Sequence, residues 1–112
     1  RLDSARWHAG LAGTPSALVF VVALAGGHWR ARMFAPGLGV PEDPATGGAA
    51  AAFAGWLAAR AASPVAATRI IQGVEMGRPS EMELDWVTEA DVVSSVRVGG
   101  AAVLVSEGRL HV

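Results

Sequence analysis

The chain has 112 residues with 9 Arg, no Lys, 10 acidic residues and no Cys, which gives a formal net charge of −1. These counts exclude disulfides, Cys-ligated metals, thiol catalysis and a broadly basic nucleic-acid-binding surface. The length fits one small domain, residues 1–112, and an apolar content of 52% excludes a disordered tail.

The first third of the chain predicts a lead-in followed by a β-hairpin. Residues 1–15 are moderately polar and are expected to be irregular. Residues 16–24 are rich in β-branched and aromatic side chains, as in a buried strand. The Gly26-Gly27 pair allows a tight turn into a second strand over residues 29–34. That strand alternates, with two arginines on one face and Trp29, Ala31 and Met33 on the other.

A Pro/Gly-rich loop over residues 35–45 leads into the clearest helix, predicted over residues 46–62 with Thr46 as its N-cap and Ser63-Pro64 after its end. This helix has no charged residue before Arg60. A helix that is apolar on all faces is expected to be enclosed on several sides.

The remainder predicts short strands over residues 67–72, 80–87, 92–98, 101–106 and 109–112. In residues 80–87, Met82, Leu84 and Trp86 alternate with acidic residues and should face inward. Gly99-Gly100 is expected to form a second hairpin turn. The predicted fold class is therefore α+β, a curled, mostly antiparallel sheet (a half-barrel) wrapped around one central hydrophobic helix.

The start of the predicted helix is the segment with the most chemical potential. Gly47 and Gly48 leave backbone N–H groups without partners, and the helix dipole favours an anion there. Asp43 and Glu42 lie just upstream. The pattern indicates a site for a carboxylate or phosphate group, with a carboxylate side chain beside it that could transfer a proton on a small acid substrate. Helix capping and close packing are the alternative explanation for the same residues.

Three ordered blocks resemble the PhzF family of phenazine-biosynthesis isomerases and their relatives, which share the diaminopimelate epimerase fold. They are RMFAPG with EDPATG at residues 32–37 and 42–47, QGVEMGRPS at residues 72–80, and VGGAAV with Glu107-Gly108 near the end. The family fold has two similar halves, each a curled sheet around a helix, with the active site between them. The resemblance implies that this chain is the C-terminal half.

The resemblance assigns Asp43 as the catalytic carboxylate of this half, and Thr46, Gly47 and Gly48 as binding the substrate carboxylate. The family commonly has Thr-Gly-Ser-Ala where this chain has Thr46-Gly47-Gly48-Ala49, so a substrate-binding hydroxyl is missing and the phenazine-pathway substrate is disfavoured. Glu42 is expected to be a solvated neighbour. The segment from Gln72 to Ser80 is interpreted as structural.

The implied function is a cofactor-independent isomerase that moves a proton on a small carboxylate-bearing substrate, active when this chain is joined to an N-terminal half carrying the acid/base glutamate. The alternatives are a catalytically inactive fragment or oligomerisation domain of the same ancestry, and a hot-dog-type thioesterase. No metal site is expected, because His8, His28 and His111 are scattered along the chain.

Expected partners are the missing half or a second copy in a homodimer, without nucleic acid or membrane. The longest strongly apolar run, residues 17–25, is far shorter than the ~20 residues of a spanning helix. The chain opens on Arg1 without a signal peptide, so we expect a piece of a longer, cytoplasmic bacterial protein.

Overall fold

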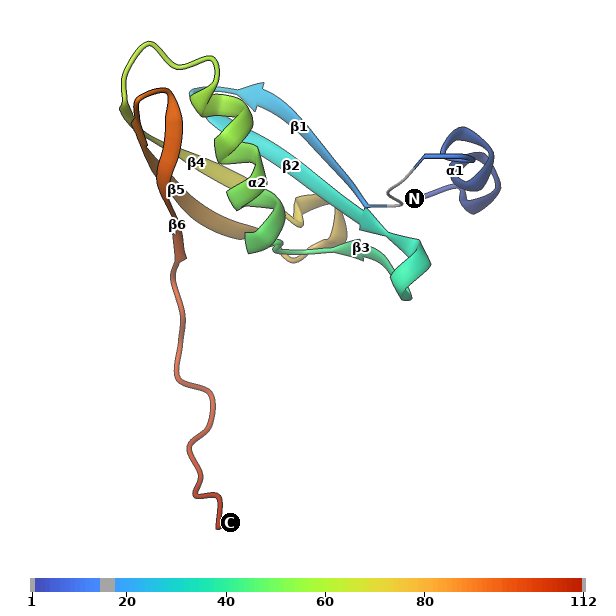
Figure 1. The fold of residues 1–112 in the computed structure, drawn as a ribbon. Coiled ribbons are helices and arrows are strands. Elements are labelled where there is room, and N and C mark those ends of the chain that lie inside the picture. Colours follow the sequence, from blue (N-terminus) through green and yellow to red (C-terminus); the bar gives the residue numbers. More distant parts are fainter. Residues whose placement is uncertain (1, 15–17, 112) are drawn as a thin grey trace.

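A computed structural model describes residues 2–14 and 18–111. Figure 1 shows a sheet with a helix lying across one of its faces. In chain order the elements are α1 (Ser4–Gly10), β1 (Val19–Ala25), β2 (His28–Ala35), the 3₁₀ helix η1 (Pro36–Leu38), β3 (Val40–Asp43), α2 (Gly47–Ala58), β4 (Val65–Gln72), the 3₁₀ helix η2 (Val74–Met76), β5 (Ser80–Glu89) and β6 (Val92–Gly100).

The six strands form one open, mixed sheet in the order β1-β2-β4-β5-β6, with β3 also paired to β2. All neighbouring pairs are antiparallel except β2 and β4, which run parallel. A parallel pair needs a crossover, and here η1, β3 and α2 make it. The predicted α+β class, with one main helix against a mostly antiparallel sheet, is confirmed.

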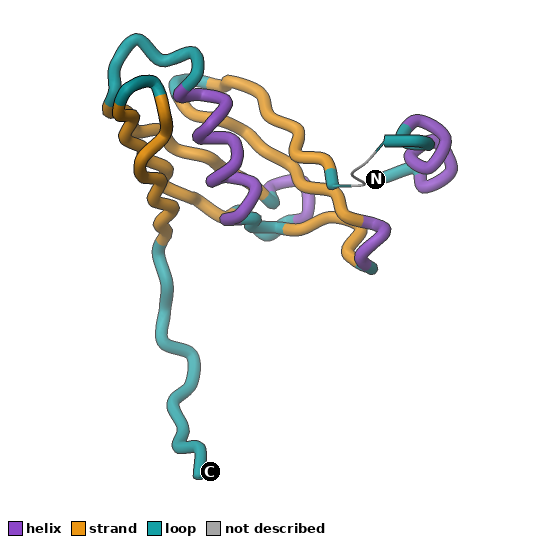
Figure 2. Tube along the Cα trace, in the orientation of Figure 1, coloured by secondary structure: helices purple, strands orange, loops and turns teal. Residues whose placement is uncertain are grey.

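Figure 2 shows α2 lying across one face of the sheet, here called the inner face. The core lies between this face and the helix. The helix contributes Ala50, Phe53 and Ala54, and the strands contribute Ala31, Ile70, Met82, Leu84 and Trp86. The small alanines let α2 approach the strands closely, and Phe53 fills the space beside Trp29, with ring centroids 5.0 Å apart. The predicted inward alternation of Met82, Leu84 and Trp86 is confirmed.

Ion pairs cover the outer face of the sheet. Arg30 pairs with Glu75, Arg32 with Glu42, and Arg69 with Glu81. The predicted separation of arginines from apolar residues along β2 is therefore confirmed. Phe34 shares this outer face and is buried. The Trp7 ring of α1 lies 5.8 Å from the Phe34 ring, and the Arg32 guanidinium lies over that ring at 4.9 Å.

Two expectations for the first 45 residues differ from the structure. Within the predicted irregular lead-in, residues 4–10 form α1, because the Asp3 carboxylate caps it by accepting from the N–H groups of Ala5 and Arg6. The predicted loop over residues 35–45 contains β3, which pairs with β2. Of the first predicted strand, residues 16 and 17 lie outside the described residues.

The main helix is shorter and more open than predicted. It ends at Ala58 instead of residue 62, because the Arg60 N–H bonds to the Leu57 carbonyl and tightens the last turn. The Arg60 side chain donates to the Trp56 carbonyl and lies over the Trp56 ring. Trp56 itself is 48% exposed, so among the described residues α2 is covered mainly on its sheet-facing side.

The predicted hairpin at Gly99-Gly100 is wrong. Neither glycine has a positive φ, and both continue β6 opposite Glu83 and Met82. A Cβ on Gly100 would lie 3.1 Å from the Glu81 carbonyl oxygen, so close packing of strands explains that glycine. The predicted strands over residues 101–106 and 109–112 are also absent from the part described, where residues 101–111 are exposed and without regular structure.

In residues 2–14 and 18–111, neither helix is both long and apolar enough to cross a membrane.

Candidate functional site

Strand β2 brings together two segments that are far apart in the sequence. Its residue Ala31 pairs with Gln72, the last residue of β4, and Met33 pairs with Asp43, the last residue of β3. Since β4 is parallel to β2 and β3 is antiparallel to it, the carboxyl ends of β3 and β4 meet head to head. Helix α2 begins four residues after Asp43.

A compact polar cluster, formed by Asp43, Thr46 and Gln72, occupies this junction. The Thr46 hydroxyl donates to the Asp43 Oδ2 atom at 2.5 Å. The Gln72 Nε2 group donates to the Thr46 hydroxyl oxygen at 3.0 Å and to the Asp43 carbonyl at 2.6 Å. The Thr46 N–H in turn donates to Gln72 Oε1 at 3.2 Å. Gln72 is fully buried, whereas Asp43 and Thr46 are partly exposed.

Thr46 precedes α2 as predicted, but its side chain makes no capping hydrogen bond. Its hydroxyl is used on Asp43 instead. The first intrahelical bond here runs from the Ala50 N–H to the Thr46 carbonyl. The N–H groups of Gly47, Gly48 and Ala49 therefore have no partner among the described residues, and both glycines are exposed. This is the arrangement that binds an anion at a helix start.

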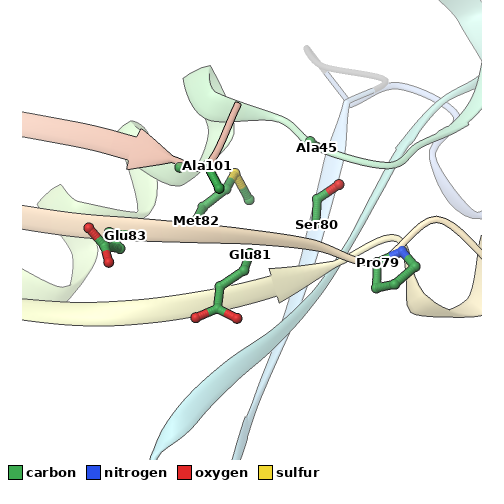
Figure 3. A pocket seen from close by; sticks show the side chains of 8 residues that line it. Ala45, Pro79, Ser80, Glu81, Met82, Glu83 and Ala101 are labelled. Atoms are coloured by element: carbon green, nitrogen blue, oxygen red, sulfur yellow. The ribbon is translucent and has the colours of Figure 1, made fainter. Parts of the chain in front are cut away.

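Two cavities flank the start of α2. One, of about 500 Å³, is mostly apolar; it is lined by Leu18, Phe20, Met33, Thr46, Gly48, Ala49, Ala52 and Phe53. The other, of about 750 Å³, includes Ala45, Ser80, Met82 and Ala101 in its lining. Figure 3 shows Ser80 and Met82 pointing toward Ala45 and Ala101, while Glu81 points to the opposite side of the strands. Asp43 lines neither cavity. Its carboxylate accepts a hydrogen bond from Thr46, which lines the smaller, apolar cavity.

Glu42 differs from its predicted role as a solvated neighbour. Its two carboxylate oxygens accept from Arg32 Nε and Nη2 at 2.8 and 2.9 Å, and its side chain is only 15% exposed. These hydrogen bonds from Arg32 hold the pKa of the Glu42 carboxyl below its usual value. Consecutive strand residues point to opposite faces of a sheet. The Glu42 side chain therefore lies on the outer face, while the Asp43 side chain lies at the start of α2.

All four site residues predicted from the sequence lie within this short stretch. Asp43 and Thr46 are in direct contact, and Gly47 and Gly48 open α2 beside them. Sequence reasoning missed Gln72, which it treated as structural. The signal was present, because a Gln directly after the apolar pair Ile70-Ile71 is a polar residue at the end of a buried strand. The described residues contain no group of three or more His, Asp or Glu side chains that could hold a metal ion.

The fold and this site together define a class of α+β proteins. In this class a carboxylate at the end of one strand lies beside the start of a helix, where two strands of a mixed sheet end. Residues 11–108 match the family of phenazine biosynthesis-like proteins, PhzC-PhzF. This chain belongs to that family.

Named relatives are similar over most of this chain. A trans-2,3-dihydro-3-hydroxyanthranilate isomerase of Pseudomonas aeruginosa is 43% identical over 105 residues, which cover 93% of this chain and 38% of the relative. An uncharacterised isomerase of Mesorhizobium japonicum is 43% identical over 86 residues, covering 75% of this chain and 28% of that protein. An uncharacterised isomerase of Deinococcus radiodurans is 39% identical over 84 residues, which cover 71% of this chain and 27% of that protein. The chain thus spans less than two fifths of the length of these relatives.

Proposed function

We propose that this chain supplies one half, the C-terminal one, of the active-site cleft of a cofactor-independent isomerase that transfers a proton on a small carboxylate-bearing substrate. The observation that carries the proposal is the contact of the Thr46 hydroxyl with the Asp43 carboxylate, next to the N–H groups of Gly47 and Gly48, which have no partner in the part of the chain that the structure describes. Names of several family relatives, which describe isomerases, support it.

The role of each group in the reaction follows from its chemistry. The N–H groups at the start of α2 bind the substrate carboxylate and stabilise negative charge that develops when a proton leaves carbon. Asp43 assists the proton transfer by hydrogen bonding or as a relay, and the N-terminal half provides the principal acid/base glutamate. The apolar cavity beside Thr46 and Gly48 receives the hydrocarbon part of the substrate.

The test replaces Asp43 by Asn in the complete gene product in which this segment occurs. The first substrate to try is trans-2,3-dihydro-3-hydroxyanthranilate, since relatives from Pseudomonas are named for it. We expect Asp43→Asn to lower the turnover number at least about tenfold, because the carboxylate can no longer accept or relay a proton. Turnover is measured together with deuterium uptake from heavy water.

The matched control is Glu89→Gln, which removes an exposed carboxylate at the far end of β5. Glu89 belongs to none of the ion pairs among the described residues and lines neither cavity beside the start of α2. The turnover of this variant is expected to equal that of the unmodified protein. An unchanged rate in Asp43→Asn would remove Asp43 from the mechanism.

A second function, assembly without catalysis, is favoured by the apolar side chains at the surface. Trp56, Val103, Leu104 and Val105 are exposed by 48%, 83%, 85% and 87%. Under this proposal they are covered by a second copy of the chain. Native mass spectrometry distinguishes the two functions, since a homodimer without isomerase activity supports assembly and a different accompanying chain supports a shared active site.

A further inference from the structure

Gln72 is a polar residue in an apolar setting. It lies at the end of β4 on the same face as Ile70, and both side chains are fully buried. A buried amide without hydrogen-bond partners destabilises a fold, because it has lost its contacts with water. Gln72 avoids this cost through the segment 43–46, because all three side-chain hydrogen bonds that it makes within residues 2–14 and 18–111 go there.

The partners of Gln72 determine where each proton lies. The Asp43 carbonyl can only accept, so the amide nitrogen faces it, and the Thr46 N–H can only donate, so the amide oxygen faces that group. The same nitrogen donates to the Thr46 hydroxyl oxygen. The Thr46 hydroxyl proton is therefore directed at the Asp43 Oδ2 atom. One side chain thus sets the direction of every hydrogen bond in the cluster.

The neighbouring glycine supports the same arrangement. Gly73 has φ +78°, and a Cβ placed there would lie 2.8 Å from the Pro44 carbonyl oxygen and 2.3 Å from that of Arg78. These are backbone atoms that cannot swing aside. The backbone of the Asp43–Thr46 segment therefore packs directly on the end of β4, where Gln72 holds it.

We infer that Gln72 is a positioning residue for the isomerase reaction: it orients the Thr46 hydroxyl and, through it, the Asp43 carboxylate. This inference rests on the proposed function for its effect on catalysis. Its effect on the geometry of Asp43 and Thr46 is independent of that function and can be measured without a substrate.

The experiment uses Gln72→Met, which keeps the volume of the side chain and removes its hydrogen bonds, in the complete gene product. We expect the Thr46 amide to exchange with heavy water at least about tenfold faster, since its acceptor is gone. The Hα–Hβ couplings of Asp43 are expected to report one side-chain rotamer in the unmodified protein and to become averaged in Gln72→Met. Unchanged exchange and couplings overturn the inference.

Kinetics separate positioning from a general loss of structure. Gln72→Met is expected to lower kcat about tenfold while KM stays within about twofold. In a Thr46→Val background, the same substitution should lower kcat no further, because the group through which it acts is absent. Equal losses of kcat in both backgrounds indicate a structural role and contradict the inference. Thr46→Ser, which keeps the hydroxyl, is expected to restore kcat and its sensitivity to Gln72→Met.

The matched control is Thr68→Val on the same face of β4, which touches no part of the segment 43–46 by a hydrogen bond among the described residues and should leave kcat unchanged. If Gln72→Met does not fold, Thr46→Val decides alone, since a single Asp43 rotamer retained in that variant contradicts the inference. If the unmodified protein turns over no carboxylate substrate, the proposed function fails, and the exchange and coupling measurements still decide the positioning role.

Discussion

Two adjacent carboxylates in this chain have different surroundings. The Glu42 carboxylate accepts hydrogen bonds from Nε and Nη2 of Arg32 on the outer face of the sheet. The Asp43 carboxylate accepts from the Thr46 hydroxyl at the start of α2. Sequence reasoning chose Asp43 for the site through the family resemblance, but it could not find the Arg32 partner. That contact depends on the pairing of β2 with β3, which no local pattern revealed.

The Arg32–Glu42 pair makes the stability of the fold depend on pH. The folded pKa of Glu42 is lowered, so its stabilising contribution is complete above the unfolded value of about 4.3 and is lost as the pH falls through the folded value. We expect Glu42→Gln to lower the free energy of unfolding by about 1 kcal/mol at pH 7. This difference should shrink toward zero below the folded pKa. Urea unfolding at several pH values measures it, and a difference that grows on acidification contradicts the assignment.

Gly48 offers space for the hydroxyl that the family pattern carries. A Cβ added there meets no atom within 4 Å. We expect Gly48→Ser to fold normally and to raise kcat/KM for trans-2,3-dihydro-3-hydroxyanthranilate about fivefold, the effect of one added hydrogen bond of about 1 kcal/mol. Steady-state kinetics on the complete gene product check this. A decrease would show that the cavity beside Gly48 is filled by another part of the substrate.

At the scale of elements, alternation in the sequence predicted strands well and glycine pairs predicted turns less well. Gly26 and Gly27 both have positive φ and form the expected hairpin between β1 and β2. Gly99-Gly100 has the same letters but serves close packing of β6 on β5. The turn between β5 and β6 falls instead at Ala90-Asp91, which carries no glycine. Local composition cannot distinguish these uses, since strand pairing decides them.

The Ala90-Asp91 turn is a place to stabilise the fold. Both residues have positive φ, +48° and +62°, a conformation that is unfavourable for alanine and better tolerated by asparagine. We expect Ala90→Asn to raise the free energy of unfolding by about 0.5–1 kcal/mol. Chemical denaturation measures the change. Ala101→Asn, in the exposed segment after β6, is the control and should change nothing; equal effects of the two substitutions would contradict the argument from backbone conformation.

The candidate site shows the same limit of local reasoning. Asp43, Thr46, Gly47 and Gly48 are neighbours in the sequence, so a helix start near a carboxylate could be predicted before the structure was known. Gln72 is 26 residues from Thr46 and enters the cluster only because β4 pairs in parallel with β2. Its contribution depends on sheet order, which a single sequence does not specify.

At the scale of the whole molecule, the chain consists of a sheet packed against α2 and an exposed segment after β6 that carries apolar side chains. Residues 101–111 follow β6 without regular structure, and Val103, Leu104 and Val105 are at least 83% exposed. In the chain alone, we expect the amides of residues 102–111 to exchange with heavy water near the unprotected rate, while those at the centre of β5 exchange slowly. Mass spectrometry of exchange measures both. Strong protection over residues 102–106 would instead support the hairpin that the sequence predicted.

The head-to-head meeting of β3 and β4 also has a consequence for the order of folding. The hairpin of β1 with β2 and the pairing of β3 with β2 involve nearby residues and can form early, whereas β4 reaches β2 only after the chain has closed a crossover of about 30 residues. The Thr46–Gln72 contact depends on that closure. The site is therefore completed by the slowest strand pairing in the sheet. Local unfolding that detaches the end of β4 breaks the site while leaving the β1–β2 hairpin intact.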